Sequence, residues 1–199
     1  MNRRSGYGGA ALSLLCASVA VASETLPEFS VCIDTEVAYF ERDYPPLSQA
    51  PLLEGFQNGN FDWVAYCGML GILRCDLSDD PLGCQRALRV EQDEIQAQIL
   101  AGLPDPDSVA GRAGQWSDDL YPRVWALAHG QSAGQDCAGM PETLEVWCEA
   151  HESAGRLGLA VLAWQVARYV DAAEPAVVSG WASVPPPLRP RQRPAGESR

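Results

Sequence analysis

The sequence contains no lysine, and all fourteen of its basic residues are arginines that stand against 26 acidic residues. We therefore expect no nucleic-acid partner, because nucleic-acid binding depends on cationic side chains that neutralise phosphates. Only two histidines are present, so acid–base catalysis and metal binding have few places to occur. Beyond residues 10–21 the chain has no long apolar run, and we expect no transmembrane segment there.

The first 23 residues have the layout of a secretory signal peptide. Arg3 and Arg4 precede the apolar run of residues 10–21, which ends in small residues. A run of about a dozen residues is too short to span a bilayer, which needs about 20. The segment predicts export by the general secretory or the twin-arginine route. The former is favoured because Ser5 and Gly6 follow the arginine pair.

Export would place the protein in the periplasm or the surrounding medium. The lack of lysine, together with abundant alanine, glycine and proline, is typical of a bacterial gene rich in G and C. Removal of Arg3 and Arg4 with the signal would leave 12 basic residues against 26 acidic ones, a net charge of −14. Such a charge keeps an exported protein soluble, or alternatively attracts a basic partner.

Six cysteines follow the predicted signal, whereas Cys16 lies within it. An even number in an exported chain predicts disulfides, and the spacings match neither structural zinc sites nor redox motifs. If Cys67 and Cys75 share one helix, they lie about 12 Å apart, which exceeds the limit of about 7 Å for a bridge. Cys75 and Cys84 flank one expected turn between helices, and Cys137 and Cys148 flank another, so each pair can close a short loop. Our hypothesis is that the pairs are Cys75–Cys84, Cys137–Cys148 and, from the two cysteines that remain, Cys32–Cys67.

Apolar residues recur mostly at intervals of three and four, which predicts helices. Tyr44-Pro45-Pro46 is expected to end the first helix, and Ser153-Ala154-Gly155 to bend or break the last long one. No segment has the alternation of a strand. The expected helices span residues 28–42, 61–75, 79–101, 117–129 and 141–169, with a short turn of helix at 176–181.

These patterns predict an all-α protein with one domain. A disulfide-stapled bundle of five or six helices would occupy residues 24–184. Residues 185–199 are rich in proline and arginine and lack apolar periodicity, so we expect a disordered tail there.

His129 is the best candidate for catalysis. It precedes a glycine-rich loop that contains Ser132 and Asp136, and either residue could orient its ring. This arrangement would suit a small hydrolase-like or metal-assisted enzyme. The simpler interpretation, which we favour, is that His129 interacts with carbonyl groups at a helix C-terminus.

Neither a metal nor another cofactor is expected. His151 has Glu145, Glu149 and Glu152 nearby, but a zinc site normally needs a further nitrogen or sulfur ligand. Residues 76–80 are rich in oxygen ligands but lack the spacing of a calcium-binding EF-hand loop.

The remaining candidates concern binding. Trp116 and Trp181 flank expected loops, where an exposed tryptophan could anchor a ligand. The preferred function is an exported, non-catalytic helical protein that binds another protein or an envelope component. Besides the enzyme centred on His129, the alternative is a carrier of apolar ligands with a cavity lined by Leu159, Leu162 and Trp164.

Overall fold

The computed structural model describes residues 26–49, 61–109, 120–130 and 136–185. In these ranges the protein forms six α-helices and one short 3-10 turn, without any strand, which confirms the all-α class. The predicted signal at residues 1–23 lies outside the described residues, and so does the predicted tail apart from Pro185.

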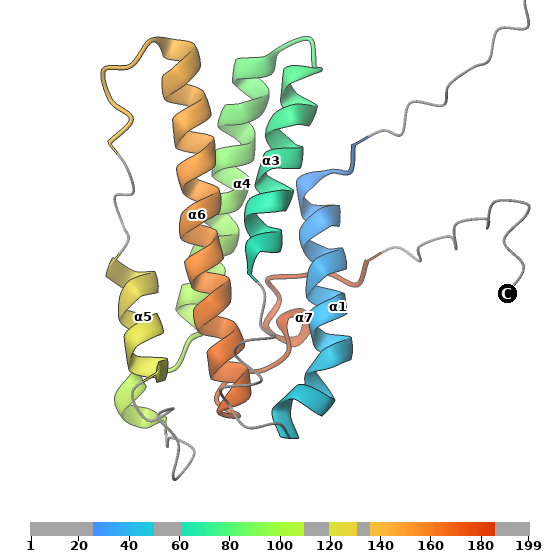
Figure 1. The fold of residues 1–199 in the computed structure, drawn as a ribbon, viewed down its shortest axis with the longest axis vertical. Helices are drawn as coiled ribbons and strands as arrows, with labels where there is room; N and C mark the ends of the chain where they lie inside the picture. The colour runs from blue at the N-terminus through green and yellow to red at the C-terminus, as the bar shows by residue number, and fades with distance from the viewer. Residues whose placement is uncertain (1–25, 50–60, 110–119, 131–135, 186–199) are drawn as a thin grey trace, which may run out of the picture.

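Helix α6 lies at the centre of the bundle, where it contacts α3, α4 and α5. Figure 1 shows α3 between α4 and α1, with α5 on the other side of α6. The short α7 lies near the lower half of α1. The elements are α1 (Phe29–Gln49), α3 (Asp62–Asp76), α4 (Pro81–Gly102), the 3-10 turn (Pro106–Ser108), α5 (Leu120–Gly130), α6 (Glu142–Tyr169) and α7 (Ala176–Ser179).

The start of α4 follows directly from its sequence. A carboxylate oxygen of Asp80 accepts a hydrogen bond from the Gly83 amide at 3.0 Å. Pro81 occupies the first turn, where the amide hydrogen that proline lacks would have no partner within the helix. The predicted end at Gly102 is also confirmed.

The predicted end of the first helix is wrong, because α1 continues through Tyr44-Pro45-Pro46 to Gln49. Proline disfavours helical geometry in the residue before it, but Tyr44 is held by distant contacts. Its hydroxyl donates to the Arg168 carbonyl at 2.7 Å, and the Arg168 guanidinium lies 4.3 Å from its ring centroid. Contacts made across the fold therefore override the local preference.

Helix α6 is one continuous element, with no break at Ser153-Ala154-Gly155. The Ser153 hydroxyl is fully buried and hydrogen bonds to both Gln92 of α4 and the Ala150 carbonyl of its own helix. This serine therefore joins two helices. The predicted start of α5 at Ser117 lies outside the described residues.

Three disulfides connect the bundle, and they join the pairs expected from helix geometry. Their Cα–Cα distances are 5.7, 5.2 and 5.8 Å, in chain order. The first bridge links α1 to α3, and the second links α3 to α4 across the turn between them. The third ties the segment before α6 to that helix. The pairs are Cys32–Cys67, Cys75–Cys84 and Cys137–Cys148.

Two glycines allow α3 to approach its neighbours closely. A Cβ atom on Gly68 would lie 2.7 Å from the Cβ of Ala154 on α6. A Cβ atom on Gly71 would lie 2.9 Å from a methyl carbon of Leu88 on α4. Both distances are too short for a side chain, so Gly68 can change only if α3 and α6 separate, and Gly71 only if the Leu88 side chain moves.

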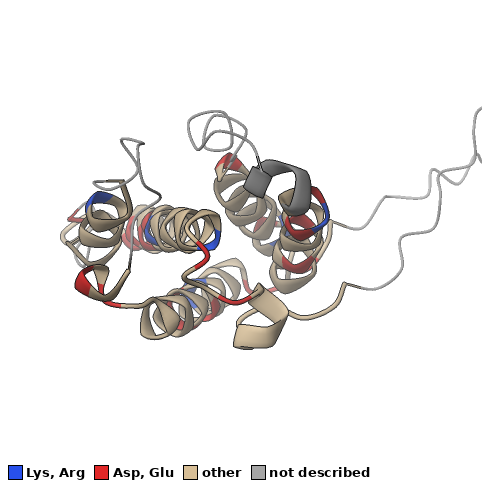
Figure 2. Ribbon diagram, turned by 90° about the horizontal axis from the view of Figure 1, so that it is seen from below, with Lys and Arg blue, Asp and Glu red and all other residues tan. Residues whose placement is uncertain are grey.

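Ion pairs line the contact between α4 and α6. Arg89 contacts Glu149 at 2.6 Å, and Arg156 contacts Asp93 at 2.9 Å. Acidic residues appear on several helices in the end-on view of Figure 2, with fewer basic residues among them. Among the helices that the structure describes, none combines the length and hydrophobicity needed to cross a membrane.

Candidate functional site

His129 lies on the exposed side of α5, in its last turn. Its Nδ1 atom is 2.9 Å from the Trp125 carbonyl, and its ring stacks on the Trp125 ring with centroids 3.8 Å apart. Both contacts lie within one helix. They match the interpretation in which the histidine interacts with carbonyl groups near a helix C-terminus.

The other two members of the possible catalytic group are not brought to His129 by any described contact. Asp136 accepts a hydrogen bond from the Ala138 amide at 3.0 Å, which makes a local turn, and it is exposed. Ser132 lies outside the described residues. The described geometry thus gives the predicted catalytic group no support.

The expectation that Trp181 is an exposed binding residue is wrong. The side chain is buried, with 5% of its surface exposed, and its ring packs edge-on against Trp164 at 4.9 Å. The segment that follows α7 folds back onto the core and carries this tryptophan with it. Trp116, the second expected binding residue, lies outside the described residues.

His151 is exposed, and its ring stacks on that of Trp147 with centroids 5.1 Å apart. Within the described ranges, no group of three or more His, Cys, Asp or Glu side chains is arranged to hold a metal ion. In the segment from Asp76 to Asp80, two carboxylates are engaged locally. Asp76 accepts from the Gln85 side chain at 2.8 Å, and Asp80 accepts from Gly83.

The residues expected to line a carrier cavity are part of the packed interior. Trp164 and Leu162 are buried, and Leu159 packs against the same core as Leu162. The indole of Trp164 donates to the Glu174 carbonyl at 3.1 Å. These side chains therefore fill space in the bundle and contribute to its stability.

Three large apolar side chains on the outer side of α3, and a fourth on Leu77 directly after its last residue, were not singled out from the sequence. The exposed fractions are 58% for Tyr66, 42% for Met69, 46% for Leu73 and 82% for Leu77. Their spacing of three, four and four residues places them in one stripe along the helix. Eleven residues of helix correspond to a stripe about 16 Å long. We call these four residues the outer face of α3.

Acidic residues lie at both ends of this outer face. Asp62 is in the first turn of α3, and Asp76 is its last residue. Asp79 and Asp80, both exposed, follow in the turn to α4. Scattered apolar residues are normal on protein surfaces, but a contiguous apolar stripe with a polar rim is typical of an interaction site.

The sequence did contain a signal for the outer face, but its meaning was ambiguous. Residues 63–73 are apolar or small on all sides of the helix. A helix of this kind is usually buried all round, so its pattern does not tell which side faces the core. Gly68 and Gly71 mark the packed side, whereas Tyr66, Met69 and Leu73 lie on the exposed side.

Comparisons with protein-family models, with curated proteins and with solved structures find no match to this chain.

Proposed function

We propose that this protein is an exported, non-catalytic helical module that binds another protein through the outer face of α3. The observation that carries the proposal is the stripe of Tyr66, Met69, Leu73 and Leu77, whose side chains are all more than one-third exposed. Burying such side chains contributes about 1.5–3 kcal/mol each. A partner that covers the stripe would gain only part of that free energy, because Tyr66, Met69 and Leu73 are already about half buried.

The expected partner surface is an amphipathic helix. A groove or stripe of this length accommodates two to three turns of helix, with anchors at intervals of three and four residues. Acidic residues at both ends of the outer face, Asp62 and Asp76, favour basic residues at the ends of the partner helix. The strongly acidic composition of the whole chain would attract such a partner over a longer range.

The disulfides also support the proposal that the protein is exported to an oxidising compartment. Three disulfides within one chain are typical of proteins from the periplasm or the medium. The bridges Cys32–Cys67 and Cys75–Cys84 attach α3 to α1 and α4. A helix held near its middle and at its C-terminal end offers a preformed binding surface, which lowers the entropy lost on binding.

The test is an affinity capture from a native envelope extract under non-reducing conditions. The full chain is compared with Leu73→Arg, which removes apolar contact and repels a basic partner. Leu144→Arg is the matched control, because Leu144 is a comparably exposed leucine, 54% exposed, on α6. We expect a stoichiometric partner that the unchanged protein and the control retain and that Leu73→Arg loses.

Salt provides a second readout of the same complex. Basic ends on the partner predict that the dissociation constant rises as sodium chloride increases, because exposed charges are screened. A partner that Leu73→Arg retains, or one whose affinity does not depend on salt, would contradict the proposed surface.

A further inference from the structure

A second surface feature is an open pocket beside the Cys75–Cys84 disulfide. Its volume is about 340 Å³, and it lies where the start of α1, the end of α3 and the first half of α4 meet. Sites for small ligands span roughly 300–1,000 Å³. The residues that matter for its chemistry are Phe29, Arg74, Ala87, Leu88, Glu91 and the disulfide itself.

The wall of the pocket is mostly apolar. Phe29 and Leu88 are buried residues whose surfaces border it. Ala87, on the exposed side of α4, leaves the entrance wide because its side chain is small. The disulfide adds two sulfur atoms to this wall. The pocket can therefore accommodate a short alkyl or aryl group.

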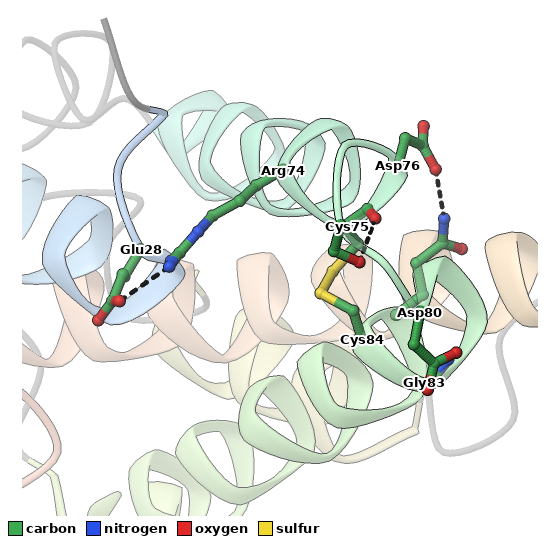
Figure 3. The surroundings of a disulfide bond; sticks show 9 residues. Glu28, Arg74, Cys75, Asp76, Asp80, Gly83 and Cys84 are labelled. Atoms are coloured by element: carbon green, nitrogen blue, oxygen red, sulfur yellow. Dashed lines mark hydrogen bonds and ion pairs between the residues drawn. A yellow bond between two sulfur atoms is a disulfide. The ribbon is translucent and has the colours of Figure 1, made fainter.

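One guanidinium, on Arg74, and two carboxylates, on Glu28 and Glu91, lie at or beside the pocket. Arg74 makes an ion pair with Glu28 at 2.9 Å, so a carboxylate outside the lining already compensates part of its charge, as Figure 3 shows. Glu91 is the other ionisable residue in the lining, and the Ser30 hydroxyl hydrogen bonds to it. Burial raises the pKa of Glu91, and the nearby charges of Glu28 and Glu94 act in the same direction.

We infer that this pocket binds a small organic cation, with its ammonium group at Glu91 and its apolar body against Leu88 and Phe29. An ammonium ion would compensate the half-buried carboxylate with charge-assisted hydrogen bonds. Arg74 and Glu91 in the lining, together with Glu28, which pairs with Arg74, carry a summed charge of −1, which disfavours an anion. A neutral apolar molecule would remove water from Glu91 without replacing its hydrogen bonds, which is costly.

This pocket is separate from the outer face of α3. Gly71 and Cys75 lie on the side of α3 that faces the pocket, whereas Met69 and Leu73 lie on the other side of the helix. The inference therefore does not depend on the proposed protein partner, and either can fail without the other.

The experiment uses the full chain with its disulfides intact and hexylammonium chloride as the probe. Titration is followed by ¹H–¹⁵N NMR, with hexanol and hexanoate as matched probes of neutral and negative charge. We expect saturable shifts at Ala87, Leu88 and Glu91 with hexylammonium and weaker binding of the other two. No saturable shift, or equal affinity for hexanol, would overturn the inference.

Two variants identify the groups responsible. Glu91→Gln should weaken hexylammonium binding about fivefold or more, because it removes the charge and keeps the shape. Glu94→Gln, at an exposed position of the same helix, is its control. Unchanged affinity in Glu91→Gln would exclude the carboxylate as the binding group.

Ala87→Leu tests the pocket by filling it, while Ala97→Leu makes the same change at another exposed position of α4. The substitution at Ala87 should block binding with an unchanged melting temperature, and the one at Ala97 should have no effect. Equal binding by the two variants would show that the cation binds elsewhere.

Discussion

The two faces of α3 differ in how far they are buried and in what they touch. The inner face carries Cys67, Gly68 and Gly71, all fully or almost fully buried against α1, α4 and α6. The outer face carries Tyr66 and Leu73, which are about half exposed. Gly68 and Gly71 allow close packing inside, beside the large buried side chains of Trp63 and Ile72, whereas the large apolar residues of the outer face add little to the stability of the fold. The inner face thus stabilises the protein, and the outer face is the proposed binding surface.

Removal of the Cys32–Cys67 bridge should have the largest effect on stability. The double variant Cys32→Ala/Cys67→Ala should lower the free energy of unfolding by about 2–5 kcal/mol, since the bridge restricts the unfolded chain. Circular dichroism during urea unfolding measures this change.

Cys137→Ala/Cys148→Ala is the matched comparison. Its loop is shorter, with a sequence separation of 11 instead of 35. Loop entropy alone predicts a cost about 1 kcal/mol smaller for the shorter loop. A larger loss from the shorter loop would show that native contacts, and not the unfolded chain, dominate the effect.

Two glycine substitutions test the close packing of the inner face. Gly68→Ala should destabilise the protein by about 1–3 kcal/mol, because the new Cβ would lie 2.7 Å from Ala154. Gly155→Ala makes the same change on α6, where a Cβ meets nothing within 4 Å. It should stabilise the helix by about 0.5–1 kcal/mol. If urea unfolding gave both variants the same sign, the packing of α3 against α6 would be looser than described.

The sequence predicted much of this inner architecture, because its determinants are local. The distance along a helix excluded a bridge between Cys67 and Cys75, and the acidic residue before Pro81 marked the start of α4. The end of α1 was missed because Tyr44 is held by Arg168, 124 residues away in the chain.

The candidate site was harder to predict than the fold. Trp181 was expected to be exposed because it flanks an expected loop, but its burial depends on Trp164, a partner that sequence spacing does not identify. The outer face of α3 was missed for another reason. When both sides of a helix carry apolar residues, the sequence pattern does not show which side faces the core. Contacts with the neighbouring helices decide which side is buried.

Glu91 is neither buried, like the inner face of α3, nor exposed, like its outer face. Burial raises its pKa above the usual value of 4.5, so the folded protein holds this proton more tightly than the unfolded chain. The stability that this group contributes is full below pH 4.5 and is lost as the pH rises through the raised pKa.

The difference in unfolding free energy between the unchanged protein and Glu91→Gln should therefore fall across that pH range. The effect should be smaller than that of Gly68→Ala, because the carboxylate is only half buried. Glu94→Gln should show a smaller trend, because Glu94 is exposed and acts on Glu91 only through its charge. A difference that rises with pH would mean that hydrogen bonds or Arg74 outweigh the burial of Glu91.

Substitutions on the outer face of α3 should have the smallest effect on stability. Leu73→Ser removes an exposed side chain, so the free energy of unfolding should change by no more than about 0.5 kcal/mol. Leu88→Ser, at a buried position of α4 that contacts Gly71, should cost several times more. Parallel urea titrations compare the two leucines directly. If Leu73→Ser were as damaging as Leu88→Ser, the outer face would be part of the core and its apolar side chains would need no partner to explain them.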